Sequence, residues 1–247
     1  MHIIGHRGAR FEAPENTLTG YRYALALGIN RFETDLYLTR DRQIAIIHDH
    51  TVDRTVTNGT GAVIDFTLKE LQALDARAQF PDWDEPAIIP SLEQMLEVLA
   101  DAAHVELEIK DTQYDIINRV IEGAASILRD LHMEDVAMFT SSHAYALETA
   151  RRLAPNVRRG LFGHFTRPEK REAAEDLGAS MVGFTYGIET EAEIAWAHEK
   201  GILIQGGPTN DAAAVDEAIA WPADAIYTDA PTSTRALFEA RGVTLER

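Results

Sequence analysis

Acidic, basic and histidine residues cluster at the ends of short apolar runs in the first half of this chain. In order they are His6-Arg7, Glu33 and Asp35, His48-Asp49, and Glu106, Glu108 and Lys110. Barrels of parallel strands expose their reactive residues at strand ends. A carboxylate inside a strand that is covered on both faces must be paired, hydrogen-bonded or bound to a metal, because leaving it unpaired is costly. The pattern therefore predicts a site that binds a metal and a phosphate group.

The carboxylates suit a hard divalent cation. A two-residue period places Glu33 and Asp35 on one face of their strand, and Glu108 lies on a second strand. In a chain without cysteine, these three are predicted to bind Mg²⁺ or Ca²⁺, with water and substrate oxygens completing the shell. Glu106 lies one layer deeper, where an internal salt bridge is the alternative.

Two histidines are candidates for proton transfer. Imidazole titrates at about pH 6.5, which makes His6 and His48 the predicted acid/base pair. His50 competes with His48, because both flank Asp49, which could orient a neighbouring ring. The other histidines are interpreted as structural: His2, His104, His132, His143, His164 and His198.

The charge balance limits the partners. A net charge of -17 disfavours nucleic acid and stable association with an anionic membrane. A phosphate site in such a chain must be positive locally. Arg7 could clamp a phosphate with its planar fork, and Lys110 could add a second positive charge.

Short strand-like runs alternate with segments of helical spacing. The eight predicted strands are residues 3–6, 31–36, 105–110, 136–140, 158–161, 181–184, 202–205 and 225–228. Such alternation indicates parallel strands with helical crossovers, and eight units favour a (β/α)8 TIM barrel. The length of 247 residues fits one domain over 1–247.

One long interruption follows the second strand. Residues 50–90 are predicted to form a small insertion at the active end, with a turn at Asn58-Gly59 and one short helix. Thr67 with Glu70, and Ser91 with Gln94, have capping-box spacing and predict helix starts.

The N-terminal residues lack the basic region of a secretory signal, and no stretch approaches the roughly 18 apolar residues of a membrane span. We therefore expect a soluble, cytoplasmic protein. A homo-oligomer is left open.

Several motifs match a known family in order and spacing. They are His6-Arg7-Gly8, Pro14-Glu15-Asn16-Thr17, Glu33-Thr34-Asp35, His48-Asp49, Asp53-Arg54-Thr55 with Asn58-Gly59-Thr60-Gly61, Glu108-Ile109-Lys110 and Thr228-Asp229-Ala230-Pro231. The chain thereby resembles the glycerophosphodiester phosphodiesterase family. The resemblance implies a TIM barrel that hydrolyses small, soluble glycerophosphodiesters to sn-glycerol 3-phosphate and an alcohol.

The resemblance also implies roles for individual residues. His6 and His48 become the acid/base pair, Glu33, Asp35 and Glu108 the ligands of Mg²⁺ or Ca²⁺, and Arg7 and Lys110 the phosphate contacts. It further implies attack by the glycerol 2-hydroxyl on phosphorus, giving a cyclic phosphate that water opens.

Two departures from the family pattern bear on the substrate. Where the family has a Trp-Thr-x-Asn pattern after the seventh strand, this chain has Gln205-Gly206-Gly207-Pro208-Thr209-Asn210, and a Ser-Ser-Phe pattern becomes Ser141-Ser142-His143. Each change removes an aromatic side chain. The alternatives are therefore another phosphodiester, as in lysophospholipase D-like or sugar-phosphodiester activity, or a catalytically silent binder of phosphate ligands.

Overall fold

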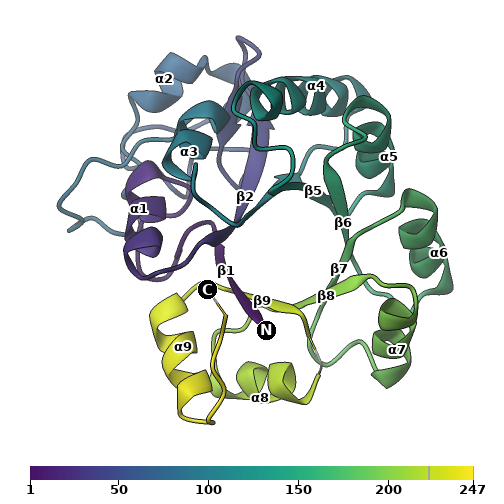
Figure 1. Ribbon diagram of the computed structural model, residues 1–247. Coiled ribbons are helices and arrows are strands. Elements are labelled where there is room, and N and C mark those ends of the chain that lie inside the picture. Colours follow the sequence, from purple (N-terminus) through teal and green to yellow (C-terminus); the bar gives the residue numbers. More distant parts are fainter. Residues whose placement is uncertain (222, 247) are drawn as a thin grey trace.

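Parallel strands close into a barrel in the computed structural model of this chain, which describes residues 1–221 and 223–246. The barrel strands are β1 (His2–His6), β2 (Arg31–Leu38), β4 (His104–Ile109), β5 (Ala137–Ser141), β6 (Arg158–Phe162), β7 (Met181–Phe184), β8 (Leu203–Gly206) and β9 (Ala225–Thr228). β1 pairs with both β2 and β9, which closes the ring. The prediction of a TIM barrel is confirmed, and Figure 1 shows the ring.

Helices surround this ring on the outside (Figure 1). They are α1 (Leu18–Ala26), α3 (Leu92–Val98), α4 (Tyr114–Asp130), α5 (Ala144–Leu153), α6 (Pro168–Leu177), α7 (Glu191–Glu199), α8 (Ala212–Ala220) and α9 (Pro231–Glu239). Alternate strand residues such as Phe32, Leu107 and Phe139 are buried in the main hydrophobic cluster, which includes apolar residues of these helices. Among the described residues, no helix has the length and apolar character needed to cross a bilayer.

The residues between these apolar positions belong to the opposite face of each strand. On β2 the apolar Phe32 and Leu36 alternate with Glu33 and Asp35. The parallel register pairs His6 of β1 with Glu33, and Asp35 with Glu108 of β4. Three neighbouring strands therefore bring their polar residues to one end of the barrel.

The segment between β2 and α3 was predicted to contain one short helix, and the structure adds a strand and a 3-10 turn. A strand, β3 (Ile44–Ile46), runs antiparallel to β2, and a 3-10 turn (Val63–Asp65) precedes α2 (Leu68–Gln72). Our sequence prediction omitted β3 because it counted only strands joined by crossovers. The segment has a hydrophobic cluster of its own, which includes Ile47 and Leu71.

At the predicted turn the chain bends at residues 57–58, without a hydrogen-bonded turn at Asn58-Gly59. The hydrogen-bonded turn lies a few residues earlier, where the amide nitrogens of Thr55 and Val56 both donate to the carbonyl of Val52. The side chain of Asn58 instead accepts a hydrogen bond from the backbone N–H of Asp75, at 2.8 Å. Asn58 thus ties two loops together, a long-range role that a local turn signal does not reveal.

Both predicted capping boxes are present, and the box of α3 gives a stability prediction. The Ser91 side chain accepts from the backbone N–H of Gln94, and the Gln94 side chain accepts from the backbone N–H of Ser91. We expect Ser91→Ala to lower the free energy of unfolding by about 1 kcal/mol, measured by urea denaturation. Ser126→Ala, at an exposed position within α4, is the control and should cause no loss. Equal midpoints for Ser91→Ala and the unmodified protein would contradict the assigned cap.

Candidate active site

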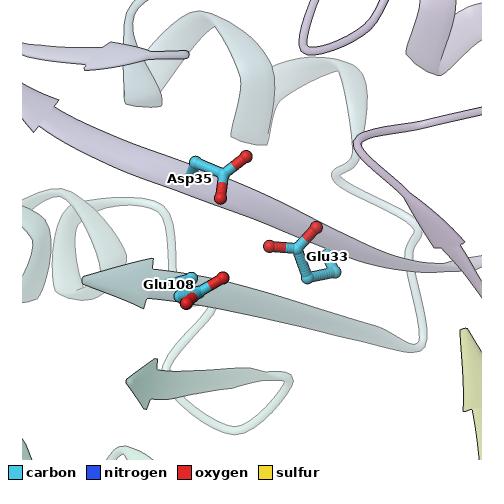
Figure 2. A group of neighbouring side chains, drawn as sticks. All are labelled: Glu33, Asp35 and Glu108. Atoms are coloured by element: carbon cyan, nitrogen blue, oxygen red, sulfur yellow. The ribbon is translucent and has the colours of Figure 1, made fainter. Parts of the chain in front are cut away.

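Three carboxylates meet inside the carboxyl-terminal end of the barrel. One oxygen from each of Glu33, Asp35 and Glu108 lies within 4.8 Å of the other two. Figure 2 shows the side chains converging from β2 and β4. Glu33 is 3% exposed and Asp35 is 0% exposed, so water screens neither charge well. The sequence-predicted ligands are therefore brought together in space.

The buried oxygens of this cluster suit a cation. Among the described residues, no contact with hydrogen-bond geometry reaches either carboxylate oxygen of Glu33 or Oδ1 of Asp35, although the Lys110 ammonium lies near the latter. Burial raises the pKa of Glu33 well above its usual value, and the charges of Asp35 and Glu108 add to the effect. A hard divalent ion satisfies such oxygens and offsets their mutual repulsion, and carboxylates are its preferred ligands. The donor set thus fits Mg²⁺ or Ca²⁺.

Two basic side chains border the carboxylates. Lys110 Nζ lies 2.7 Å from Glu108 Oε2 and 3.2 Å from Asp35 Oδ1, while Arg7 Nε lies 3.3 Å from Asp35 Oδ2. Burial alone would raise the pKa of Asp35, but the charges of Lys110 and Arg7 outweigh it and hold that pKa below its usual value. Positive charge is therefore concentrated at one site of an acidic protein.

A tight turn after β1 places Arg7 there. Arg7 has a φ of 52° and Gly8 a φ of 89°, so the chain enters the left-handed region at both residues. At Gly5 a Cβ atom would lie 2.3 Å from the carbonyl oxygen of Gly8, so the turn also requires the absence of a side chain. The guanidinium of Arg7 is further held by Glu15, which accepts a hydrogen bond from Nη1 at 3.2 Å.

His6 is held by a carboxylate from the last strand connection. Its Nδ1 lies 2.5 Å from Oδ1 of Asp229, and its Nε2 lies 3.5 Å from Oε2 of Glu33. Asp229 also accepts hydrogen bonds from Arg10 at 2.6 and 2.9 Å and from Nδ2 of Asn210 at 2.7 Å. An ionised Asp229 only accepts, so the proton of this contact belongs to Nδ1, and Nε2 faces the carboxylate cluster.

Removal of the Asp229 charge is expected to change the titration of His6. Burial lowers the pKa of His6, and the hydrogen bond to Asp229 opposes that effect. Asp229→Asn should therefore lower the pKa further and shift the corresponding limb of the kcat/KM profile to lower pH. We also expect kcat to fall roughly tenfold to a hundredfold, as for other residues that orient a reactive side chain. An unshifted pH profile in a folded Asp229→Asn protein would contradict this positioning role.

His48, which follows β3, is held in the same way, and the charges of Asp35, Arg7 and Lys110 act on it. Its Nδ1 lies 2.6 Å from Oδ1 of Asp49, and Oδ2 of Asp49 accepts from Nε of Arg54 at 2.6 Å. Burial alone would raise the pKa of Asp49, but these two hydrogen bonds lower it to about 2. Burial lowers the pKa of His48. His50 is exposed, so the structure pairs Asp49 with His48.

A cavity of about 260 Å³ opens beside His6 and the carboxylates of Glu33 and Glu108. Its polar lining consists of His6, Arg7, Glu33, Glu108, Lys110 and Gln205, and its aromatic lining of Phe162 and Tyr227. Tyr227 lies against His6 with ring centroids 5.1 Å apart. At Gly207 a Cβ atom would meet the Tyr227 ring at 2.6 Å. The Tyr227 ring therefore occupies the space that a side chain at position 207 would need.

Several of these residues were not predicted from the sequence. Asp229 was noted only as part of a motif, and Arg10, Asn210, Gln205 and Tyr227 received no role. The available signal was position, because Asp229 directly follows β9 just as Arg7 follows β1. Glu106 stands apart from the carboxylate cluster, since its Oε1 lies 3.1 Å from Nε2 of His104. That contact is the internal pairing considered as its alternative.

Comparison with known proteins identifies the chain. A profile described as the glycerophosphoryl diester phosphodiesterase family matches residues 6–233. The chain belongs to this family. A glycerophosphodiester phosphodiesterase of Caldanaerobacter subterraneus is 35% identical over 160 residues, which are 64% of this chain and 65% of that protein. The match thus spans less than two thirds of this curated relative's length.

Solved structures of glycerophosphoryl diester phosphodiesterases and related enzymes share the architecture over almost the whole chain. A phosphodiesterase of Oleispira antarctica, in complex with the product sn-glycerol-3-phosphate, is 25% identical with a TM-score of 0.88 and covers 97% of each chain. A glycerophosphodiester phosphodiesterase of Agrobacterium tumefaciens is 29% identical with a TM-score of 0.82, covering 97% of this chain and 99% of that one. The barrel and its extent are thus those of the glycerophosphoryl diester phosphodiesterase family.

Proposed function

We propose that this protein hydrolyses glycerophosphodiesters to sn-glycerol 3-phosphate and an alcohol, with a divalent cation as cofactor. The observation that carries the proposal is the cluster of Glu33, Asp35 and Glu108, of which Glu33 and Glu108 line the same cavity as His6 and Lys110. Family membership and the product bound in the Oleispira antarctica structure support the same reaction.

The proposed roles follow from the atoms that each residue presents. Arg7 and Lys110 bind the phosphate oxygens and reduce repulsion between the anionic substrate and the acidic cluster. His6, held at Nδ1 by Asp229, exchanges a proton at Nε2, and His48, held at Nδ1 by Asp49, does the same. One ring accepts the proton of the attacking hydroxyl and the other protonates the departing oxygen. When bound, Mg²⁺ or Ca²⁺ supplies Lewis-acid charge at the phosphoryl oxygens.

The far wall of the cavity bears on the choice of substrate. Phe162 and Tyr227 offer apolar faces, while Gln205 is 1% exposed and, among the described residues, neither polar atom of its amide has a partner. An unpaired buried amide favours a ligand group that can hydrogen-bond to it. We therefore propose that Gln205 contacts a hydroxyl of the substrate. Because residues 141–143 and 205–210 differ from the family pattern, a diester with another polar alcohol is the second candidate.

A product assay tests the reaction. Purified protein is incubated with glycerophosphocholine, glycerophosphoethanolamine, glycerophosphoglycerol and a generic phosphodiester, with Mg²⁺, with Ca²⁺ or with EDTA. We expect release of glycerol 3-phosphate that stops in EDTA and returns with added metal. Hydrolysis of only the generic diester would favour the second candidate. Absence of hydrolysis with every substrate and both metals would refute the proposed activity.

A further inference from the structure

A second cavity, of about 300 Å³, lies at the amino-terminal end of the barrel, away from the carboxylate cluster. Four strands contribute nitrogen-bearing side chains to its lining: His2 from β1, Arg31 from β2, His104 from β4 and Arg158 from β6. Arg31 lies four residues before Asp35 on the same strand face, and the register pairs it with His104. A group of basic side chains therefore lies at the amino-terminal end of the barrel, which we call its lower end.

Arg31 and Arg158, the two arginines of this group, form no ion pair with a carboxylate of the described residues. Among residues 1–221 and 223–246, no carboxylate oxygen lies within 4.0 Å of either guanidinium. Nε of Arg31 and Nε of Arg158 are buried without a hydrogen-bond acceptor in that same part of the chain. Arg158 uses Nη2 alone, which lies 3.1 Å from Nδ1 of His104 and 3.3 Å from the carbonyl oxygen of Val136. Several donors thus remain free on two neighbouring cations.

Each of the three carboxylates that line the cavity has a partner other than the two arginines. Glu106 contacts Nε2 of His104 at 3.1 Å, and Asp224 accepts from the backbone N–H of Ile204 at 2.8 Å. Glu246 lies 3.5 Å from Nε2 of His2 and is 65% exposed. Burial, followed by the charge of Arg158, lowers the pKa of Arg31, as expected for two guanidiniums that repel each other. The charge of Glu246 opposes this effect, but the pKa of Arg31 remains lowered, so the acids of the described residues offset the repulsion only in part.

We propose that the lower cavity binds a small tetrahedral oxyanion, such as phosphate, between Arg31 and Arg158. The planar fork of arginine matches such an oxyanion with paired N–H donors, and an anion between two guanidiniums would remove their repulsion. This site is separate from the catalytic cavity. Gln205 lines both cavities and so lies where they adjoin, whereas Arg31 and Arg158 line only the lower one.

Binding of inorganic phosphate to the full, Mg²⁺-loaded chain tests the proposal, by isothermal titration calorimetry and by the rise in melting temperature. Arg31→Gln and Arg158→Gln should each weaken the lower site by about tenfold to a hundredfold. Arg31→Lys keeps the charge but loses the fork, and should give a smaller loss. Arg129→Gln removes an equal charge from an exposed position of α4 and should bind as the unmodified protein does.

A variant of the catalytic cavity separates the two sites. Lys110→Met removes a phosphate contact from the upper cavity, so it should leave the phosphate affinity of the lower site unchanged. The proposal is overturned if phosphate binding disappears in Lys110→Met, if both glutamine variants match Arg129→Gln, or if the unmodified chain binds no phosphate. The last result would mean that water alone fills the cavity. Because the readout is binding, it does not depend on hydrolysis.

Discussion

Replacement of Glu108 with alanine is expected to abolish most of the metal-dependent activity, with kcat/KM at least about 100-fold lower. Glu108 is the contribution of β4 to a cluster whose other carboxylates, Glu33 and Asp35, come from β2. Without it the cation loses one of its charged ligands. Its removal also leaves Lys110 without the carboxylate oxygen that lies 2.7 Å away. Titration with Mg²⁺ and Ca²⁺, followed calorimetrically, should show weaker binding, and excess metal should restore part of the rate.

Glu106→Gln is the matched control, because Glu106 is the preceding residue on the same face of β4 and contacts His104 instead of the cluster. This variant should bind the metal as tightly as the unmodified protein. If Glu108→Ala keeps both its metal affinity and its rate, the cation is held by other groups. If both variants lose metal affinity and rate equally, the cause would be damage to β4 and not the loss of a metal ligand.

His6→Ala and His48→Ala are each expected to lower kcat by roughly 10²- to 10⁴-fold, the usual range for removal of a general acid or base. The effect on KM should be small, since Arg7 and Lys110 remain to bind the phosphate. Steady-state kinetics with saturating metal measures both constants. His50→Ala is the control for His48, because His50 also neighbours Asp49 but is exposed, and it should keep its rate.

The pH dependence of the two variants provides a second readout. Burial lowers the pKa of both His6 and His48. Each alanine variant should therefore lose one limb of the kcat/KM profile, and that limb should fall at a lower pH than for a free imidazole. A folded, metal-loaded variant of either residue with near-normal turnover and both limbs intact would remove that histidine from the mechanism.

Much of this architecture is determined by local sequence. Alternation of apolar and polar residues defined the barrel strands to within one or two residues at each end, because one face packs on helices and the other lines the barrel. The spacing of Glu33 and Asp35 placed both on that inner face, and Ser91 with Gln94 fixed the start of α3. These patterns involve residues that are close together in the sequence, so the local structure that they specify can be predicted without knowledge of the tertiary fold.

Other features exist only in the closed barrel. Asp229 and His6 are 223 residues apart, and their contact requires β9 to pair with β1. Closure likewise places Tyr227 beside His6 and gathers Arg31 and Arg158 around one lower cavity. β3 depends on β2 as its antiparallel partner. The sequence thus determined which residues face inward, whereas the ring closure decided which of them meet, because contacts between distant strands depend on the tertiary arrangement and not on local periodicity.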